Sequence, residues 1–295
     1  MKLLSRILAA TDFSAAAQLA VTRAGQLASQ HGADLHLIHA TPDWNLFSRW
    51  TSARQEHYDQ VSLHAHAAMR DEVNRILSTF GVHARGEVQL GKASQVILRA
   101  LASYQPSVLI MGARGEHSPR VSPAALGGTS LKLFLHCESP LLLVRDENAS
   151  PYSTSIAAVH EASDVAKSVV LWGSSLVPGG DCHVVHAYEA PYVERMRLCG
   201  VDDAAVQASI LAAEAAARAS LDKVITSGAP EARVHFHLAH GHPLAVLVTE
   251  VARHGPQLVV VGRHESARGR PQRELLGSMA LRMAYHTPVD VLVIP

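Results

Sequence analysis

The sequence predicts an α/β protein of two domains in tandem, each a doubly wound, five-stranded parallel sheet flanked by helices. Short apolar runs alternate along the chain with longer segments of helical periodicity. The runs lack the period-two alternation of a sheet with one solvated face, so helices are expected on both faces. The same order of elements occurs twice, which places the domains at residues 1–147 and 153–295.

The first half opens with an apolar run that stops at Asp12. Ser14 can cap the helix that follows because its hydroxyl accepts an amide hydrogen, and Gly32 ends that helix. Five strands are expected in this half, at residues 5–11, 34–40, 82–90, 108–111 and 140–144. Helices are expected between them, at residues 15–31, 52–80, 94–104 and 129–136. The polar, proline-containing segment 145–153 is the expected linker.

The second half repeats this order. Its strands are expected at residues 155–159, 182–187, 235–239, 258–261 and 289–294, with an alanine-rich helix at 203–226. Residues that mark element ends recur 150 positions apart: Gly91 and Gly241, Gly112 and Gly262, Gly127 and Gly277, His136 and His286. A shared offset at so many positions indicates a duplicated domain, in two copies and therefore not a solenoid.

Composition excludes several classes of protein. The 26 basic and 26 acidic side chains give zero formal net charge, which argues against a dedicated nucleic-acid binder. Three cysteines without a CxxC pair fit a reducing compartment. No apolar run approaches the roughly 20 residues of a membrane span, and the N-terminal apolar patch is too short for a signal peptide. We therefore expect a cytoplasmic protein with no nucleic-acid or membrane partner.

The most informative stretch is the one that follows the fourth strand. In an open parallel sheet, ligands bind beyond the carboxyl ends of the strands where the strand order reverses. A strand order of 3-2-1-4-5 places Asp12 beside Gly112 at that point. The carboxylate of Asp12 could bind ribose hydroxyls, and Gly112 and Gly115 could let the backbone approach phosphates.

The helix that follows could complete an anion site. Amides and hydroxyls of Gly127, Gly128, Thr129 and Ser130 would lie at its N-terminus, where the helix dipole favours negative charge. Arg114 could add a charge-assisted contact. The alternative is that the glycines only serve tight turns between strand and helix. The chain has no GxxxxGK[ST] and no GxGxxG after the first strand, which argues against a P-loop or a dinucleotide site.

These motifs resemble the universal stress protein family in its tandem, two-domain form. The resemblance covers nearly the whole chain and rests on Ile7–Ser14 with Thr11 and Asp12, the strand-two histidine His39, the stretch 110–115, and 276–278 followed by 285–294. ATP-binding members carry an Asp after strand one and GxxG, nine residues, then Gly with Ser or Thr. The resemblance implies a Rossmann-like fold, adenine-nucleotide binding, dimer formation and a stress-response role without settled catalysis.

The first half departs from that pattern at two points. Eleven residues, not nine, separate Gly115 from Gly127, and Gly128 stands where serine is expected. Thr129 or Ser130 could take over the hydroxyl role. We still expect the first half to dominate the binding of ATP or a related nucleotide, through Thr11, Asp12, Gly112, Arg114, Gly115, Gly127, Gly128, Thr129 and Ser130.

The second half departs further. Glu265 replaces the second glycine and Glu161 replaces the strand-one aspartate, and a glutamate that faces a phosphate would repel it. The loop also carries Arg263, Arg268, Arg270 and Arg273, so an anion site remains open. Weaker nucleotide contacts are expected here, from Glu161, Gly262, Arg263, Gly277 and Ser278.

Two other functions stay open. The protein could be an interaction protein whose sites have lost nucleotide, or a weak ATPase, although no motif places a nucleophile beside a base. The last strands, 141–144 and 291–294, are edges that need cover. The resemblance implies that they pair, in a homodimer or in an intramolecular pseudo-dimer of the two halves.

Histidine is abundant, with 19 residues. His235 and His237 share one face of a strand, and His240 and His242 follow, so zinc is conceivable. No cysteine or carboxylate completes the set nearby, and we expect polar side chains at a strand end and no metal. His39 and its counterpart His186 are expected to be satisfied, half-buried histidines; the alternative is a pH-sensitive group in the cleft.

Overall fold

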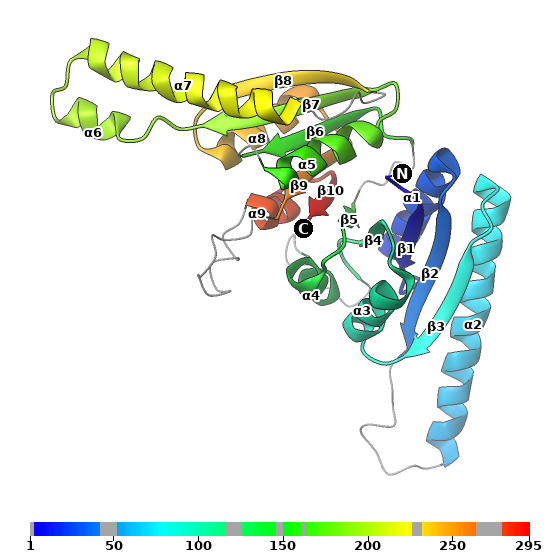
Figure 1. The fold of residues 1–295 in the computed structure, drawn as a ribbon. Coiled ribbons are helices and arrows are strands. Elements are labelled where there is room, and N and C mark those ends of the chain that lie inside the picture. The colour runs from blue at the N-terminus through cyan, green and yellow to red at the C-terminus, as the bar shows by residue number, and fades with distance from the viewer. Residues whose placement is uncertain are drawn as a thin grey trace. The chain divides into compact units, whose positions relative to one another are not determined.

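The computed structural model describes residues 3–41, 52–115, 126–145, 150–160, 163–225, 232–263 and 279–295 (Figure 1). Side chains at 52–58, 225 and 286 lie outside this description. The chain forms two compact units, Met1–Ser150 and Pro151–Pro295, here called unit 1 and unit 2. Each unit is described by itself.

Unit 1 is a parallel sheet whose strands are hydrogen-bonded in the order β3-β2-β1-β4-β5. The strands are β1 (Arg6–Ala10), β2 (Asp34–Thr41), β3 (Arg85–Leu90), β4 (Val108–Gly112) and β5 (Leu141–Val144). The helices are α1 (Ala15–His31), α2 (Ser52–Phe80), α3 (Ala93–Tyr104) and α4 (Gly128–His136). Strand order reverses at β1, which pairs with β2 on one side and β4 on the other.

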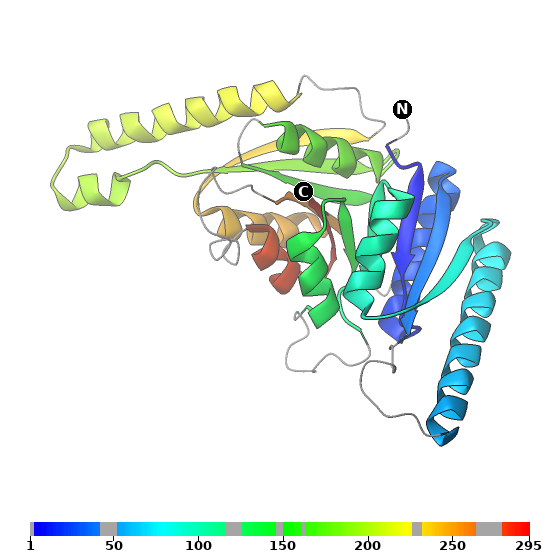
Figure 2. The same cartoon turned by 60° about the horizontal axis from the view of Figure 1, so that its bottom comes forward.

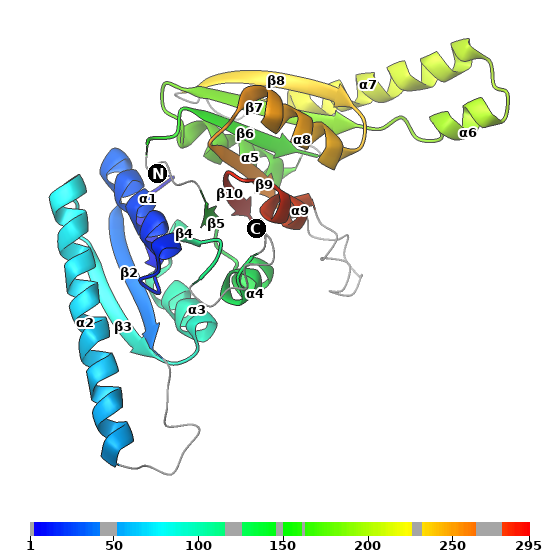
Figure 3. The same ribbon diagram turned by 180° about the vertical axis from the view of Figure 1, so that it is seen from behind.

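Helices cover both faces of this sheet. α1 and α2 pack on one face, and α3 and α4 on the other (Figure 3 shows the side of α1). The central strands β1 and β4 are buried almost throughout, with Ile7, Leu109 and Ile110 fully inaccessible. Such strands bury both faces and therefore consist of continuous apolar residues.

Unit 2 repeats the arrangement with strand order β8-β7-β6-β9-β10, all parallel. The strands are β6 (Thr154–Val159), β7 (Asp181–Tyr188), β8 (Arg233–His240), β9 (Leu258–Gly262) and β10 (Asp290–Ile294). The helices are α5 (Asp164–Ser175), α6 (Val193–Leu198), α7 (Asp203–Ile225), α8 (Pro243–His254) and α9 (Met279–His286). In Figure 2, α5 (green) and α7 (yellow) lie on one face of these strands, and α8 (orange) and α9 (red) on the other.

The predicted fold class and strand order are confirmed in both units. The Ser14 hydroxyl accepts the Ala17 amide at 3.3 Å, and Gly32 ends α1 with a left-handed φ of 57°. Two local expectations were wrong. β3 begins at Arg85 and not at residue 82, and the short helix α6 was not expected. A membrane-spanning helix does not occur among the described residues, since none combines the necessary length with a sufficiently apolar sequence.

Candidate functional site

The turn after β1 is fixed by its own side chains. The Thr11 hydroxyl accepts the Phe13 amide at 3.0 Å, and Asp12 Oδ1 accepts the amide and hydroxyl of Ser14 at 3.1 and 2.5 Å. Phe13 adopts a left-handed φ of 61°, which is unusual for an aromatic residue, and its ring packs on His39 at 4.4 Å. These contacts hold Asp12 in place at the carboxyl end of β1.

The two glycines after β4 have different surroundings. A Cβ on Gly112 would lie 2.9 Å from the Arg114 carbonyl oxygen and 3.1 Å from that of Ala16, both backbone atoms. A Cβ on Gly115 would meet only the carboxyl group of Asp12, at 2.7 Å from Oδ2. Close packing of β4 against α1 therefore explains Gly112, as the tight-turn alternative requires. Close packing of strand against helix does not explain Gly115, whose lack of a side chain lets the backbone lie next to the Asp12 carboxylate.

The start of α4 presents backbone amides that no side chain of the N-cap residue satisfies. The N-cap residue, Gly127, provides no side-chain cap, and its own amide donates to the Ala113 carbonyl at 2.9 Å. Amides in the first turn of a helix have no intrahelical acceptor, and they carry the positive end of the helix dipole. Ser130 is buried and its hydroxyl donates to the Gly112 carbonyl at 3.1 Å.

These pieces surround one open cleft of about 580 Å³ at the carboxyl ends of β1, β2 and β4. All nine residues predicted for unit 1 line it: Thr11, Asp12, Gly112, Arg114, Gly115, Gly127, Gly128, Thr129 and Ser130. Apolar side chains form a second part of the wall, among them Ile38, Val61, Ala65, Ile97 and Met111. The cleft thus combines an apolar wall with a polar wall that contains a carboxylate, a guanidinium and a helix N-terminus.

Unit 2 has a smaller hollow at the corresponding place, about 270 Å³ as lined by its described residues. Gly262 lines it, and a Cβ there would lie 2.6 Å from Val165 Cγ1, so this glycine also serves the packing of strand against helix. The Arg263 amide donates to the Ile294 carbonyl at 2.6 Å. The other residues predicted for this half, Glu161, Gly277 and Ser278, lie outside the described residues, as do Glu265, Arg268, Arg270 and Arg273.

Comparison with known proteins matches both units to the same family. The model of the universal stress protein family matches residues 4–145 and again residues 154–295. The chain belongs to this family. A universal stress protein of Mycolicibacterium smegmatis is 24% identical over 308 aligned positions, which cover 98% of this chain and 96% of the relative. A universal stress protein structure from Archaeoglobus fulgidus matches with a TM-score of 0.68 and 17% identity, over 98% of this chain and 97% of that one.

Sequence reasoning missed part of the universal stress protein cleft of unit 1. Lys132 lines the cleft from the second turn of α4. It lies four residues after Gly128 and so on the same face of the helix, which is a signal that could have been noticed. The apolar wall could not, because its side chains come from β2, α2, α3 and β4 and meet only in the fold.

The strand-two histidines are both satisfied by backbone. His39 Nδ1 lies 2.8 Å from the Thr11 carbonyl oxygen, and His186 Nδ1 lies 3.0 Å from that of Val159. His39 also lines the cleft of unit 1. Burial lowers the pKa of His39 below its ordinary value, and this effect outweighs the Thr11 hydrogen bond and the nearby Asp12, which raise it.

We expect the stability of unit 1 to fall as the pH decreases below about 6.5, the pKa of an unfolded histidine. The folded pKa of His39 is lower, so the unfolded chain binds the additional proton in the interval between the two values. Urea unfolding between about pH 5 and 8 should show this slope, reduced in His39→Gln and unchanged in His64→Gln on the exposed face of α2. An NMR titration that gives His39 a pKa at or above 6.5 would contradict the prediction.

The other histidines singled out from the sequence separate in the structure. His240 packs on Tyr188 at 5.3 Å between ring centroids, and His242 Nδ1 accepts the Leu244 amide at 3.3 Å as the N-cap of α8. His237 instead lies next to His183, with Nε2 2.9 Å from Nδ1 of that ring. His235 stacks on His183 at 5.0 Å between centroids. Within residues 235–242, His242 therefore caps a helix, whereas His235 and His237 belong to a histidine cluster on β7 and β8.

Proposed function

We propose that the cleft of unit 1 binds an adenine nucleotide, ATP or a close relative, and that the protein acts as a nucleotide-responsive module in a stress response. The observation that carries the proposal is the meeting of Asp12, Gly115 and the uncapped start of α4 around one cleft. They lie where the strand order reverses, which is where open α/β sheets bind ligands.

Each part of the cleft matches one part of a nucleotide. The apolar wall around Ile38 and Met111 suits adenine. The carboxylate of Asp12, held through Oδ1 by Ser14, suits the ribose hydroxyls. The amides of the first turn of α4, with Arg114 and Lys132, suit phosphates.

Thr129 is the hydroxyl that we assign to the phosphates. The hydroxyl of Ser130 is buried and holds the Gly112 carbonyl, so its role is to fix the loop to α4. Thr129 is partly exposed and lines the cleft. In this assignment, the hydroxyl of Thr129 takes the role that a serine at position 128 would have.

Unit 2 is proposed to bind nucleotide more weakly. Its hollow is smaller, and Val165 occupies the position that Ala16 has in unit 1, against the end of the fourth strand. Pairing of the outermost strands β5 and β10, between copies or between units, stays a prediction from the sequence.

The proposal is tested by calorimetric titration with ATP and ADP, together with mass spectrometry of the protein as purified. We expect one equivalent to bind, and a co-purified nucleotide would support the proposal. An absence of binding by every adenine nucleotide would favour an interaction protein with degenerate sites. Phosphate release above that of a Gly115→Glu control would favour a weak ATPase.

Gly128→Ser is expected to tighten nucleotide binding about fivefold. Among the described residues, no atom lies within 4 Å of a Cβ placed on Gly128, so they leave room for a serine at the first helical position of α4. One added hydrogen bond to a charged group contributes roughly 1 kcal/mol or more. Gly128→Ala is the matched control, since it adds the Cβ without the hydroxyl, and equal affinities for the two variants would contradict the prediction.

A further inference from the structure

We propose that unit 2 carries a transition-metal site formed by His183, His237 and His254, which binds a divalent ion of the zinc class. No part of the proposed nucleotide cleft is involved. In the described part of the chain, these side chains form the one group of three or more histidine, cysteine, aspartate or glutamate residues that could hold a metal ion.

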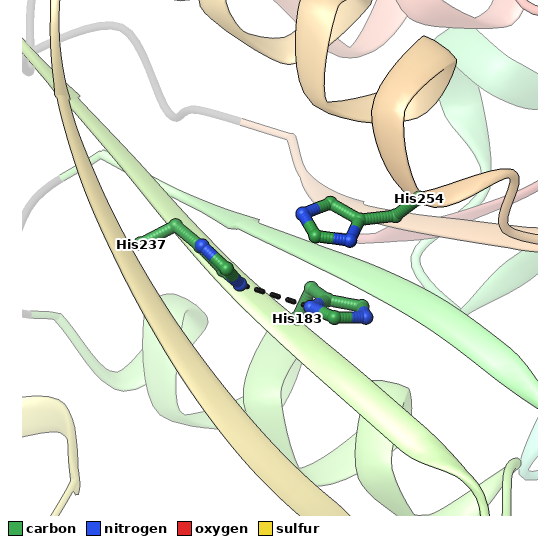
Figure 4. A group of neighbouring side chains, drawn as sticks. All are labelled: His183, His237 and His254. Carbon is green, nitrogen blue, oxygen red and sulfur yellow. Dashed lines mark hydrogen bonds between the residues drawn. The ribbon is translucent and has the colours of Figure 1, made fainter.

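The three rings come from three elements. His183 lies on β7, His237 on the neighbouring strand β8, and His254 is the last residue of α8, which packs over these strands (Figure 4). One ligand atom from each ring lies within 4.8 Å of the others. The rings of His183 and His254 are stacked at 3.8 Å between centroids, and His237 and His254 lie at 4.9 Å.

This spacing is close to that of a metal centre. Zinc binds imidazole nitrogen at about 2.0–2.1 Å, so tetrahedral ligands lie roughly 3.3 Å apart. His183 Nδ1 and His237 Nε2 are 2.9 Å apart, so they need to open by only a few tenths of an ångström. Three imidazoles with an open fourth position are the ligand set of catalytic zinc sites, and imidazole ligands also suit copper and nickel.

Glu250 orients one of the ligands. It is 7% exposed, and its Oε2 lies 3.0 Å from His254 Nε2. A carboxylate that accepts the Nε2 hydrogen leaves the Nδ1 lone pair of the same ring for a metal, which is the usual partnership around metal-bound histidine. Gly255 ends α8 directly after His254, so the negative end of the helix dipole adds to the attraction for a cation.

Charged side chains near the cluster pair with one another. Arg233 donates two hydrogen bonds of 2.9 and 2.8 Å to Asp181, and His235 Nε2 lies 2.8 Å from the same carboxylate. Arg253 lies 3.8 Å from Glu250, and Arg218 and Asp222 line a hollow together with His237 and Glu250. Neutral imidazole is the form that binds metal.

Unit 1 provides an internal comparison. In register, His36 pairs with Arg85 as His183 pairs with His235, so Glu87 corresponds to His237. There His36 Nε2 lies 3.3 Å from Glu87 Oε2.

The helix of unit 1 that corresponds to α8 also lacks the metal-binding side chains. α3 and α8 have the same length of 12 residues, so Tyr104 corresponds to His254 and Ala100 to Glu250. Unit 1 therefore has one histidine of the three and lacks the orienting carboxylate. Ligands and carboxylate occur together only in the unit 2 copy of this position.

Zinc titration of the chelator-treated full chain, at pH 7.5 and without nucleotide, tests the proposal. We expect one equivalent to bind well ahead of any weaker histidine sites. His237→Gln and His254→Gln should each lower the affinity for that equivalent at least 100-fold. Glu250→Gln should lower it 10- to 100-fold, and the matched control His36→Gln by less than twofold.

X-ray absorption of the wild-type protein with one equivalent of Zn²⁺ needs no variant. We expect three imidazole nitrogens at about 2.0 Å. Fewer than three imidazoles, or a first equivalent bound equally tightly by wild type, His237→Gln and His254→Gln, would overturn the proposal. Circular dichroism of each metal-free variant separates loss of ligands from loss of fold.

Discussion

Replacing Gly115 by glutamate is expected to lower the affinity of the protein for ATP at least 100-fold. A Cβ at this position would lie 2.7 Å from Asp12 Oδ2, so the substitution displaces the carboxylate assigned to the ribose. It also adds a second negative charge beside the phosphates, and two like charges about 4 Å apart repel by roughly 4 kcal/mol near a protein surface. A 100-fold loss corresponds to about 2.7 kcal/mol, well within this repulsion.

Calorimetric titration of the variant with ATP provides the measurement, with two controls. Gly115→Ala adds only the Cβ, which meets Asp12 Oδ2 but brings no second negative charge, and it should therefore cause a smaller loss. Gln207→Glu adds the same charge on the exposed face of α7 and should leave the affinity unchanged. An unaltered affinity in Gly115→Glu would show that the nucleotide, if bound, does not use this cleft.

Tyr152→Phe is expected to destabilise unit 2 by about 2–3 kcal/mol. Tyr152 is 3% exposed, and its hydroxyl donates at 2.5 Å to Asp290 Oδ2, which is fully buried at the start of β10. Removing the donor takes a hydrogen bond from a buried carboxyl group, and the desolvation of that group is then less well offset.

Urea unfolding followed by the fluorescence of Trp172 measures this loss, because Trp172 is buried in α5 of the same unit. The other two tryptophans, Trp44 and Trp50, are replaced by phenylalanine in every sample. Tyr188→Phe is the matched control in the same unit, since that hydroxyl makes a long contact of 3.5 Å to Glu214 Oε2, and it should cost under about 0.5 kcal/mol. Equal losses in the two variants would contradict the importance of the buried pair.

Most of the fold could be predicted because the strands are short, apolar and punctuated by glycines at a constant offset. The failures came where local sequence does not decide. α6 has only six residues and depends on packing against α7, with Val193 buried. Residues before Arg85 are apolar enough for a strand, but Gly81 has a φ of 66° and the ladder with β2 starts at His36 and Arg85.

The candidate sites also contain residues that the sequence marks and residues that only the fold brings together. Asp12 and Gly112 are marked in the sequence because each lies at the end of an apolar run, and Gly127 because it precedes a helical pattern. The histidine cluster is not, because His183, His237 and His254 come from separate elements and no spacing rule connects them. Sequence spacing marked His237, as one of the pair His235 and His237, but not the other two members of the cluster. It also marked His240 and His242, whose side chains serve the strand end and the helix cap instead.

Because Gly112 and Gly115 have different surroundings, the two glycines of the GxxG stretch carry different information about ligand binding in a related domain. Gly112 and Gly262 are both required by the approach of a helix to the end of a strand, so mutational drift cannot remove either without cost to folding. A half that has given up its ligand therefore retains the first glycine. A Cβ on the second glycine, Gly115, meets a side chain and not backbone among the described residues. We therefore expect its replacement, as by Glu265 in the second half, to accompany a weaker or different ligand.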